Sequence, residues 1–469
     1  MIRFAAINTP SSQGSSHMTH CNLKMTSFSS LGSKKIEADF NGGRITSDTG
    51  ALLLREIEQQ TGLIKAMNKA IPDPRDPARI EHDQQSMLAQ RVFGIALGYE
   101  DLNDHATMRA DPALLTAVGQ SPHDAPEAVG ASAPTLHRLE NRIDQKTLFH
   151  IADAIINDFI ASYNTPPESL ILDFDATDSE IHGHQEGRFF HGYYDSYCYL
   201  PLYVFCGDSL LAAYLRPSKI DAAKHTQAIL KLIVTKLRAV WPNVLITIRA
   251  DSGFCRWRLL RWCDSNGIGY IIGLAQNKKL LEMSAELIET AARTFQATGE
   301  KQRIFGMLHY GAATWDRKRR VIAKAEYTEK GSNPRFVVTN VPGNAQSLYD
   351  DVYCQRGEME NRIKEQQHDL FANRTSCHRF LANQFRILLS AAAYILMEKL
   401  RRVGLKGTSM ERAQVGTIRL KLLKVASRVV VSARRVVFHL SRSYPYQALF
   451  REVLSRLTTS EELRRASPA

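Results

Sequence analysis

The chain has 469 residues, 44 % of them hydrophobic, and its 60 Lys and Arg outnumber its 48 Asp and Glu to give a formal net charge of +12. This composition supports a folded core and excludes a largely disordered chain, while seven cysteines without a CxxC pair argue against a disulfide framework or a structural zinc site. No continuous apolar run reaches the roughly 18 residues of a membrane span, so we expect a cytoplasmic protein without a membrane partner.

The N-terminal third divides into two parts. Residues 1–36 are rich in Ser, Thr, Asn and Gly without periodicity, which predicts a disordered tail. Residues 37–165 repeat apolar positions at steps of three and four, for example in "GALLLREIEQQTGL" and "DQQSMLAQRVFGIALGYEDLND". This period predicts a helical region.

The pattern changes at "SLILDFDATDSEIHG", residues 169–183. Apolar residues suit a buried strand here, and because side chains alternate along a strand, Asp173 and Asp175 project from the same face. Carboxylates on a buried strand are unusual, so the presence of two here calls for a structural or functional explanation. Turn and capping roles are the plain alternative.

The next elements supply a second acid. The pieces 197–206 and 209–216 flank Gly207-Asp208 and predict a hairpin, followed by a helix at 220–240 and by "VLITIRADSGF", a strand that ends in Asp251. A right-handed crossover would place this strand parallel to the first, so both acids would meet at one sheet edge. Two close aspartates favour a cation, and Mg²⁺ prefers such oxygen ligands.

A third carboxylate comes from "YCQRGEMENRIKEQQHDL". On a helix, Tyr353, Arg356, Glu360, Lys364 and Gln367 fall at steps of three and four and share one face. Glu360 is central on that face and is the candidate third ligand. Taken alone, Arg356 and Glu360 would be read as a surface ion pair.

These residues resemble the DDE transposases of bacterial insertion sequences. That family has an Asp in a D-x-T context, a second Asp at a strand end and a Glu in a Y-x2-R-x3-E helix, which correspond here to Asp175, Asp251 and Glu360. The opening "FNGGRITSDTGALLLREI" resembles the branch called insertion-sequence family 1380. Relatives often place a Lys seven residues after the Glu, where this chain has Gln367; the nearest basic residue on the face is Lys364.

The resemblance implies a fold class and a domain order. The fold would be α/β, with a ribonuclease H-like mixed sheet flanked by helices and interrupted by a β-rich insertion. The expected order is a helical region for DNA-end binding or dimerisation at 37–165, the first part of the core at 166–275, the insertion at 276–345, the Glu-bearing helix at 346–400 and a basic C-terminal region at 401–469.

The resemblance also implies the chemistry. Asp175, Asp251 and Glu360 would bind two Mg²⁺ ions, with Mn²⁺ as a substitute, for cleavage at the element's ends and strand transfer to a target. Tyr353, Arg356 and Lys364 would contact DNA or position the helix. The partners would be double-stranded terminal inverted repeats and target DNA, bound by a homodimer at the bacterial nucleoid.

The charge distribution agrees with a nucleic-acid partner. Residues 401–469 contain fifteen Lys or Arg and four Asp or Glu, so nearly the whole positive excess lies there. A solvated surface is the plain alternative. Two other functions stay open from the sequence: a DNA-binding protein of transposon descent without catalysis, and a ribonuclease H-like nuclease or resolvase that cuts branched DNA.

Overall fold

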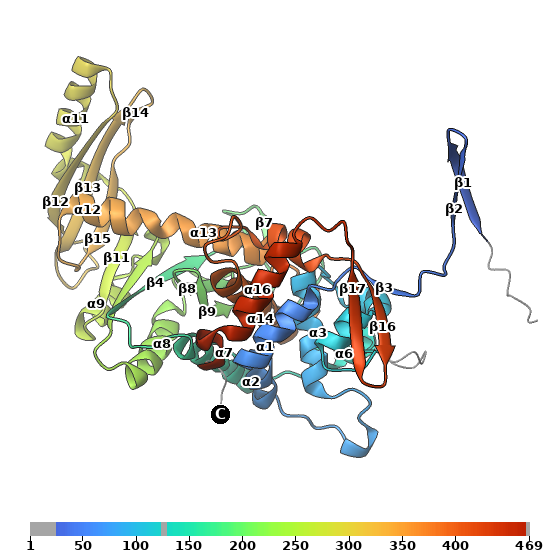
Figure 1. The fold of residues 1–469 in the computed structure, drawn as a ribbon. Helices are drawn as coiled ribbons and strands as arrows, with labels where there is room; N and C mark the ends of the chain where they lie inside the picture. The colour runs from blue at the N-terminus through green and yellow to red at the C-terminus, as the bar shows by residue number, and fades with distance from the viewer. Residues whose placement is uncertain (1–24, 123–128, 466–469) are drawn as a thin grey trace, which may run out of the picture.

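A nine-stranded mixed sheet organises the molecule. The computed structural model describes residues 25–122 and 129–465. Its main strand order is β12-β13-β15-β11-β10-β4-β8-β9, with the short β14 beside β13 (Figure 1). The strands are β4 (Ser169–Ala176), β8 (Leu202–Cys206), β9 (Ser209–Tyr214), β10 (Leu245–Ala250), β11 (Gly269–Leu274), β12 (Gln302–Tyr310), β13 (Arg319–Thr328), β14 (Gly331–Ser332) and β15 (Arg335–Thr339).

The central strands follow the predicted order. β8 and β9 form an antiparallel hairpin whose turn contains Gly207 at φ +56°, which confirms the hairpin. β10 lies parallel to β4 and to β11, which confirms that the two Asp-bearing strands are neighbours. The predicted strand 197–206 is interrupted at Pro201, which supplies no backbone N–H, so its first half forms the separate strand β7 (Ser196–Tyr199).

Two helices follow β9 and β10 along the chain. α8 (Thr226–Val240) begins later than the predicted residue 220, because His225 has a left-handed φ of +69°. α9 (Trp257–Ser265) connects β10 to β11. Leu230 and Leu237 of α8 and Leu260 of α9 are buried in one core with Leu172 of β4. This packing holds β4, β10 and β11 in register at the edge where the aspartates lie.

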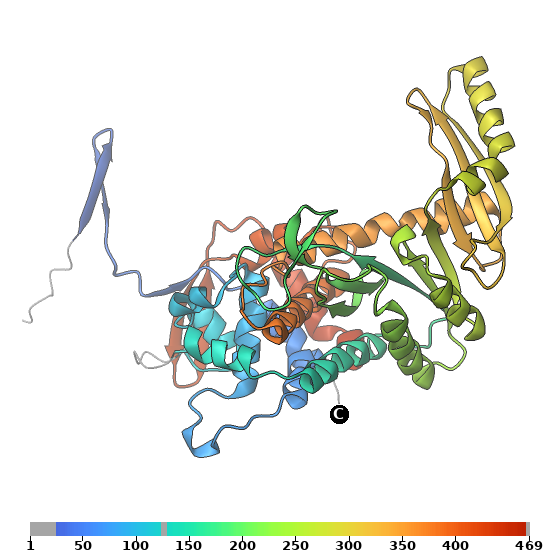
Figure 2. The ribbon, with the colours of Figure 1, turned by 180° about the vertical axis from the view of Figure 1, so that it is seen from behind.

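The segment 276–345 adds both helices and strands. α10 (Lys278–Met283) and α11 (Ala285–Thr298) come first, and β12, β13 and β15 then continue the central sheet beyond β11. In Figures 1 and 2, α11 and β14 rise away from the rest of the molecule at one end. The strand-like pieces therefore do form strands, but these strands extend the core sheet.

Helices make up the other half of the molecule. α14 (Phe380–Lys399) runs through it and is buried along nearly its whole length. By length and composition this helix could span a membrane, but 89 % of its most apolar window is buried inside the fold. It therefore serves as the core helix. Around it pack α1 (Ala51–Thr61), α2 (Leu63–Ala70), α3 (Gln84–Leu97), α6 (Ala133–Asn141) and α7 (Gln145–Ala161).

The basic C-terminal segment packs against the N-terminal part. β16 (Ser427–Ser432) pairs with β17 (Arg435–Leu440) on one side and with β3 (Arg44–Thr46) on the other. α16 (Gln447–Thr459) contributes Val453 to the core around α14. Several cations of this segment already serve the fold, since Arg401 contacts Glu365 at 2.7 Å and Lys424 contacts Asp48 at 2.6 Å.

The N-terminal end differs from its expectation in the part that is described. β1 (Thr26–Leu31) and β2 (Lys34–Ala38) pair into an exposed hairpin that stands apart from the body in Figure 1, where disorder was expected for residues 1–36. Gly32 at φ +60° sits at its turn. The rest of the expected tail lies outside the described residues.

Candidate active site

Two aspartates come together at the ends of β4 and β10. The parallel register pairs Asp173 with Arg249 and Phe174 with Ala250. Extending this register by one residue places Asp251 beside Asp175. Both follow apolar strand residues that are buried in the sheet, so packing of the strands positions the two carboxylates.

Asp173 is engaged elsewhere. Its side chain is 2 % exposed, and both of its carboxylate oxygens accept hydrogen bonds from the Arg249 guanidinium, with Nη2 to Oδ2 at 2.7 Å. Arg249 also donates to the backbone carbonyl of Val352. Asp173 is thus half of a buried ion pair, two residues before Asp175 on the same face of β4. Arg249 is not among the predicted site residues, although a charged residue inside the apolar strand "VLITIRA" is a signal for such a partner.

Arg356 connects the third acid to this edge. It lies directly before α13 (Gly357–Lys364), and its Nη2 donates to Glu360 Oε1 at 2.7 Å. Its Nη1 lies 3.5 Å from Asp175 Oδ2. The predicted i,i+4 pair of Arg356 and Glu360 is therefore present, and it reaches across to the strand end.

The electrostatics of the site centre on Asp175. Burial raises the pKa of this carboxyl to about 7, the Arg356 charge opposes the rise, and the carboxylates of Asp251 and Glu360 add to it. The charges of Arg356, Asp251 and Glu360 therefore all act on the Asp175 carboxyl. An acid whose pKa is shifted this far in a partly buried cluster is typical of functional sites.

The helix around Glu360 is irregular. The predicted continuous helix contains π-helical turns at Leu348–Tyr353 and Glu365–Asp369 and a 3₁₀ turn at Cys354–Arg356. Such π turns occur frequently at functional sites. Here they change the direction in which successive side chains project on both sides of Glu360.

Tyr353 lies over β11. A Cβ placed on Gly273 would come within 2.6 Å of the Tyr353 hydroxyl, so glycine is needed here for close approach. Burial raises the pKa of Tyr353, and the nearby Asp251 carboxylate contributes to the rise. Tyr353 therefore packs beside the second aspartate.

Lys364 and Gln367 have different surroundings. Lys364 is exposed and forms no ion pair among the described residues. Gln367 is buried, and its Nε2 donates to the carbonyl of Asp178 at 2.8 Å and approaches Thr177 Oγ1 at 3.4 Å. The position at which relatives often have Lys thus holds the helix against the end of β4.

The donor set suits a hard divalent cation. Carboxylate oxygens at a strand edge are the ligands that Mg²⁺ prefers, and a cation here would oppose the burial and the neighbouring carboxylates that raise the pKa of Asp175. Within residues 25–122 and 129–465, no three His, Cys, Asp or Glu side chains are gathered closely enough to hold a metal ion in this conformation. The Arg356 guanidinium contacts both Asp175 and Glu360 instead.

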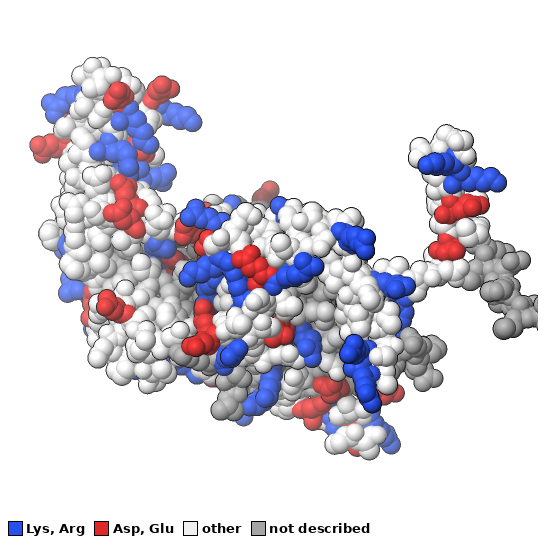
Figure 3. Space-filling view, viewed as in Figure 1, with Lys and Arg blue, Asp and Glu red and all other residues white. Residues whose placement is uncertain are grey.

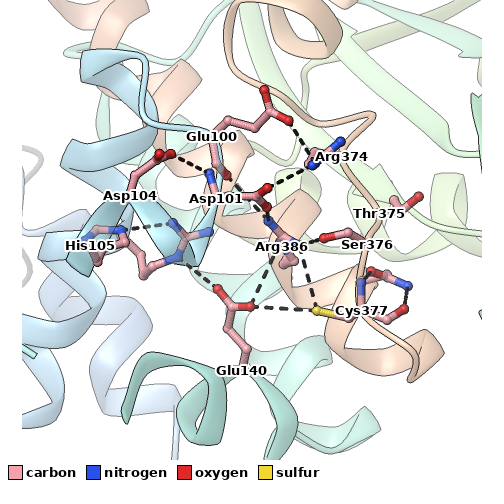
Figure 4. A network of polar contacts seen from close by, with 12 residues as sticks. Glu100, Asp101, Asp104, His105, Glu140, Arg374, Thr375, Ser376, Cys377 and Arg386 are labelled. Carbon is pink, nitrogen blue, oxygen red and sulfur yellow. Dashed lines mark hydrogen bonds and ion pairs between the residues drawn. The ribbon is translucent and has the colours of Figure 1, made fainter. Parts of the chain in front are cut away.

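A buried polar network joins the helical part to the segment after α13 (Figure 4). Arg91 Nε donates to Glu140 Oε1 at 2.9 Å, and Arg91 Nη1 lies 3.1 Å from His105 Nε2. Arg386 on α14 lies 3.2 Å from Asp101 and 3.9 Å from Glu140. Since none of these contacts comes from adjacent sequence, the network sets how α3, α6 and α14 lie together.

The fold brings Asp175 and Asp251 together where β4 and β10 end, with the Arg356–Glu360 pair beside them. The chain matches the family described as Transposase DDE domain group 1 over residues 28–462. It belongs to that family, and its class is that of the DDE transposases.

No curated protein matches the chain by sequence. Among solved structures, a piggyBac transposase synaptic complex with hairpin DNA aligns at a TM-score of 0.42 and 12 % identity, over 90 % of this chain and 86 % of that one.

Proposed function

We propose that this protein is a DNA transposase that cleaves the ends of an insertion sequence and joins them to target DNA by metal-dependent phosphoryl transfer. One observation carries the proposal: in a chain of the DDE transposase family, Asp175 and Asp251 lie side by side at parallel strand ends, with the Arg356–Glu360 pair reaching across to them. A bacterial element of insertion-sequence family 1380 is the origin that we propose.

The topology supports a ribonuclease H-like core. Read from one edge, β9, β8, β4, β10 and β11 form consecutive neighbours, with β8 antiparallel to β4 and with β4, β10 and β11 parallel. This arrangement has the first acid on the central strand and the second on its parallel neighbour. Ligands of such sheets bind outside the carboxyl ends of the strands.

We assign the three acids as metal ligands. Asp175, Asp251 and Glu360 would hold two Mg²⁺ ions, which Mn²⁺ could replace. When bound, the ions would activate the attacking oxygen and stabilise the departing one at phosphorus. In the present conformation Arg356 supplies the opposing positive charge, so this side chain would turn from Asp175 toward a DNA phosphate when cations enter.

The surfaces around the acids suit double-stranded DNA. Lys364 is exposed on the Glu360 helix, one turn beyond the acid, where it can reach a phosphate. Arg434 and Arg435 are exposed at the β16–β17 turn, and Figure 3 shows Lys and Arg side chains over that part of the surface. We propose terminal inverted repeats and target DNA as the partners, bound inside the cell at the nucleoid by a homodimer.

The decisive experiment is cleavage of a duplex that carries the terminal repeat of the element encoding this chain. We expect Mg²⁺-dependent nicking at the repeat boundary by the wild type, and a loss on the order of 100-fold or more in Glu360→Gln with binding retained. Glu358→Gln is the matched control, because Glu358 is exposed on the same helix.

The alternatives predict other outcomes of the same assay. A catalytically inactive DNA-binding protein would bind the repeat and leave it intact with either Mg²⁺ or Mn²⁺. A resolvase-like nuclease would cut four-way junctions in preference to the repeat and would not join strands.

A further inference from the structure

A cluster of exposed aromatic rings lies on a small sheet beside the active site. Between β4 and β8 the chain forms β5 (Ser179–Glu180), β6 (Phe189–His191) and β7, in the order β5-β7-β6. Rings on β6, on β7 and in their turn are open to solvent. The exposed fractions are 38 % for Phe189, 54 % for Phe190, 86 % for Tyr193 and 47 % for Tyr197.

This hairpin is held in place by the rest of the fold. Ser218 Oγ donates to the carbonyl of Phe189 at 2.8 Å, and the Tyr199 hydroxyl donates to the carbonyl of Glu186 at 2.6 Å. Phe190 lies opposite Tyr197 in the ladder, and their rings meet edge to face at 5.6 Å between centroids. These contacts fix the arrangement of the rings, and the edge-to-face geometry leaves ring faces free for other contacts.

Positive charge accompanies the rings. The Arg188 guanidinium lies 4.7 Å from the centroid of Tyr197, and Lys219 Nζ lies 5.4 Å from that of Phe189. The turn itself contains one acid, the exposed Asp195. Aromatic rings interleaved with cations match the two parts of a nucleotide strand, the bases and the phosphates.

The cluster is close to the carboxylates. β5 begins four residues after Asp175, and Gln367, which follows α13, donates its Nε2 to the carbonyl of Asp178 at 2.8 Å, directly before β5. Tyr194, in the same turn, is near enough that the charges of Asp178 and Asp175 add to the effect of burial, which raises its pKa to about 12. Whatever covers these rings therefore lies beside the acids.

We propose that the β6–β7 hairpin is a stacking platform for the unpaired bases of DNA whose phosphate is held at Asp175, Asp251 and Glu360. Bases inside a duplex are covered on both faces by their neighbours, so rings of this kind can stack only on bases that have left the duplex. Phe190 and Tyr193 are the most exposed of the rings and are the stacking residues. This inference rests on the proposed function.

The test compares two short duplexes in EDTA, one blunt and one with a single-stranded oligo(dT) tail that contains one 2-aminopurine. We expect the wild type to bind the tailed duplex about tenfold more tightly than the blunt one and to quench the 2-aminopurine, because each stacked base strengthens binding. The double variant Phe190→Ala/Tyr193→Ala should lose the preference and the quenching while it binds the blunt duplex as the wild type does.

Two matched variants separate stacking from other effects. Tyr193→Phe keeps the ring and should retain the preference. Phe149→Ala removes a ring that is 48 % exposed on α7, within another part of the surface, and should also retain it. Thermal unfolding of all variants should match the wild type, because the altered side chains are exposed.

Each other result contradicts the inference. Retention of the tail preference by the double variant overturns it, as does equal binding of blunt and tailed duplexes by the wild type, and both leave the proposed function standing. Failure of the wild type to bind either duplex overturns the proposed function as well. If sedimentation shows that the double variant converts a dimer into a monomer, the rings bind a second copy of the chain and not DNA.

Discussion

Asp173 and Arg249 form a buried ion pair two residues before Asp175 and Asp251 on their strands, and this pair separates the roles of the acids on β4. Asp173 and Asp175 share a face of the strand, but only Asp173 has both oxygens bound by a guanidinium. Asp175 is left at the strand end, facing Asp251 and Arg356.

We expect Asp173→Asn to destabilise the protein by about 3–5 kcal/mol, because it leaves the Arg249 charge buried without its partner. Urea unfolding measures this loss. Asp175→Asn should show no such loss and should abolish cleavage. If Asp173→Asn unfolds like the wild type but does not cut DNA, then Asp173 and not Asp175 is the first ligand.

The pH dependence of stability should carry the signature of Asp175. Its pKa is about 7 in the folded protein, above the usual 3.8, so the folded state binds the extra proton and loses stability as the pH rises from about 4 to 7. Without metal, Asp175→Asn should therefore be more stable than the wild type at pH 8, by about 4 kcal/mol, and equal to it near pH 4. Thermal unfolding in EDTA checks both values.

Addition of Mg²⁺ extends that experiment. Because a cation that binds only the folded state stabilises it, Mg²⁺ should raise the unfolding temperature of the wild type at pH 8 and have little effect on Asp175→Asn. An equal effect of Mg²⁺ on both proteins would show that the cation binds elsewhere.

The β16–β17 turn should contribute phosphate contacts. Replacing Arg434 and Arg435 by Ala should weaken binding to any duplex and reduce the slope of log K against log salt by about 0.9 for each lost contact. Lys231→Ala, on the exposed side of α8, is the control and should leave the slope unchanged. Fluorescence anisotropy over a salt series gives these slopes. Unchanged slopes in the double variant would remove the turn from the DNA surface.

Acid should unfold the helical part through His105. Burial and the neighbouring Arg91 charge lower the pKa of His105 to about 3. Below about pH 6.5 His105 is therefore protonated in the unfolded chain but remains neutral in the folded protein. Between pH 6.5 and 4.5 the wild type should lose about 1.4 kcal/mol per pH unit more than His105→Gln. Parallel pH dependences for the two proteins would refute this assignment.

Local sequence patterns predicted the strands and the helix that carry the candidate acids. The alternation in "SLILDFDA", the Gly207-Asp208 turn and the helical spacing around Glu360 each reflect the preference of a short segment, and the corresponding strands, hairpin and helix are present. The crossover rule then placed β10 beside β4. Two element boundaries differed from the prediction: Pro201 divides the predicted strand 197–206, and the left-handed backbone of His225 delays the start of α8.

The remainder depended on distant contacts. Nothing local in "SRVVVS" or "RIT" indicates that β16 would pair with β3, which lies near the opposite end of the chain. Likewise the polar network of Arg91, Glu140 and Arg386 forms only when three helices pack together.

The sequence by itself determined the order of the candidate acids and the strands and helix that carry them, because alternation and helical spacing act within a few residues. Only the tertiary structure decided which aspartate has both oxygens bound by a buried arginine. Asp173 and Asp175 are equivalent in strand periodicity, and it is the register between β4 and β10 that gives Arg249 to one of them and leaves the other at the edge of the sheet.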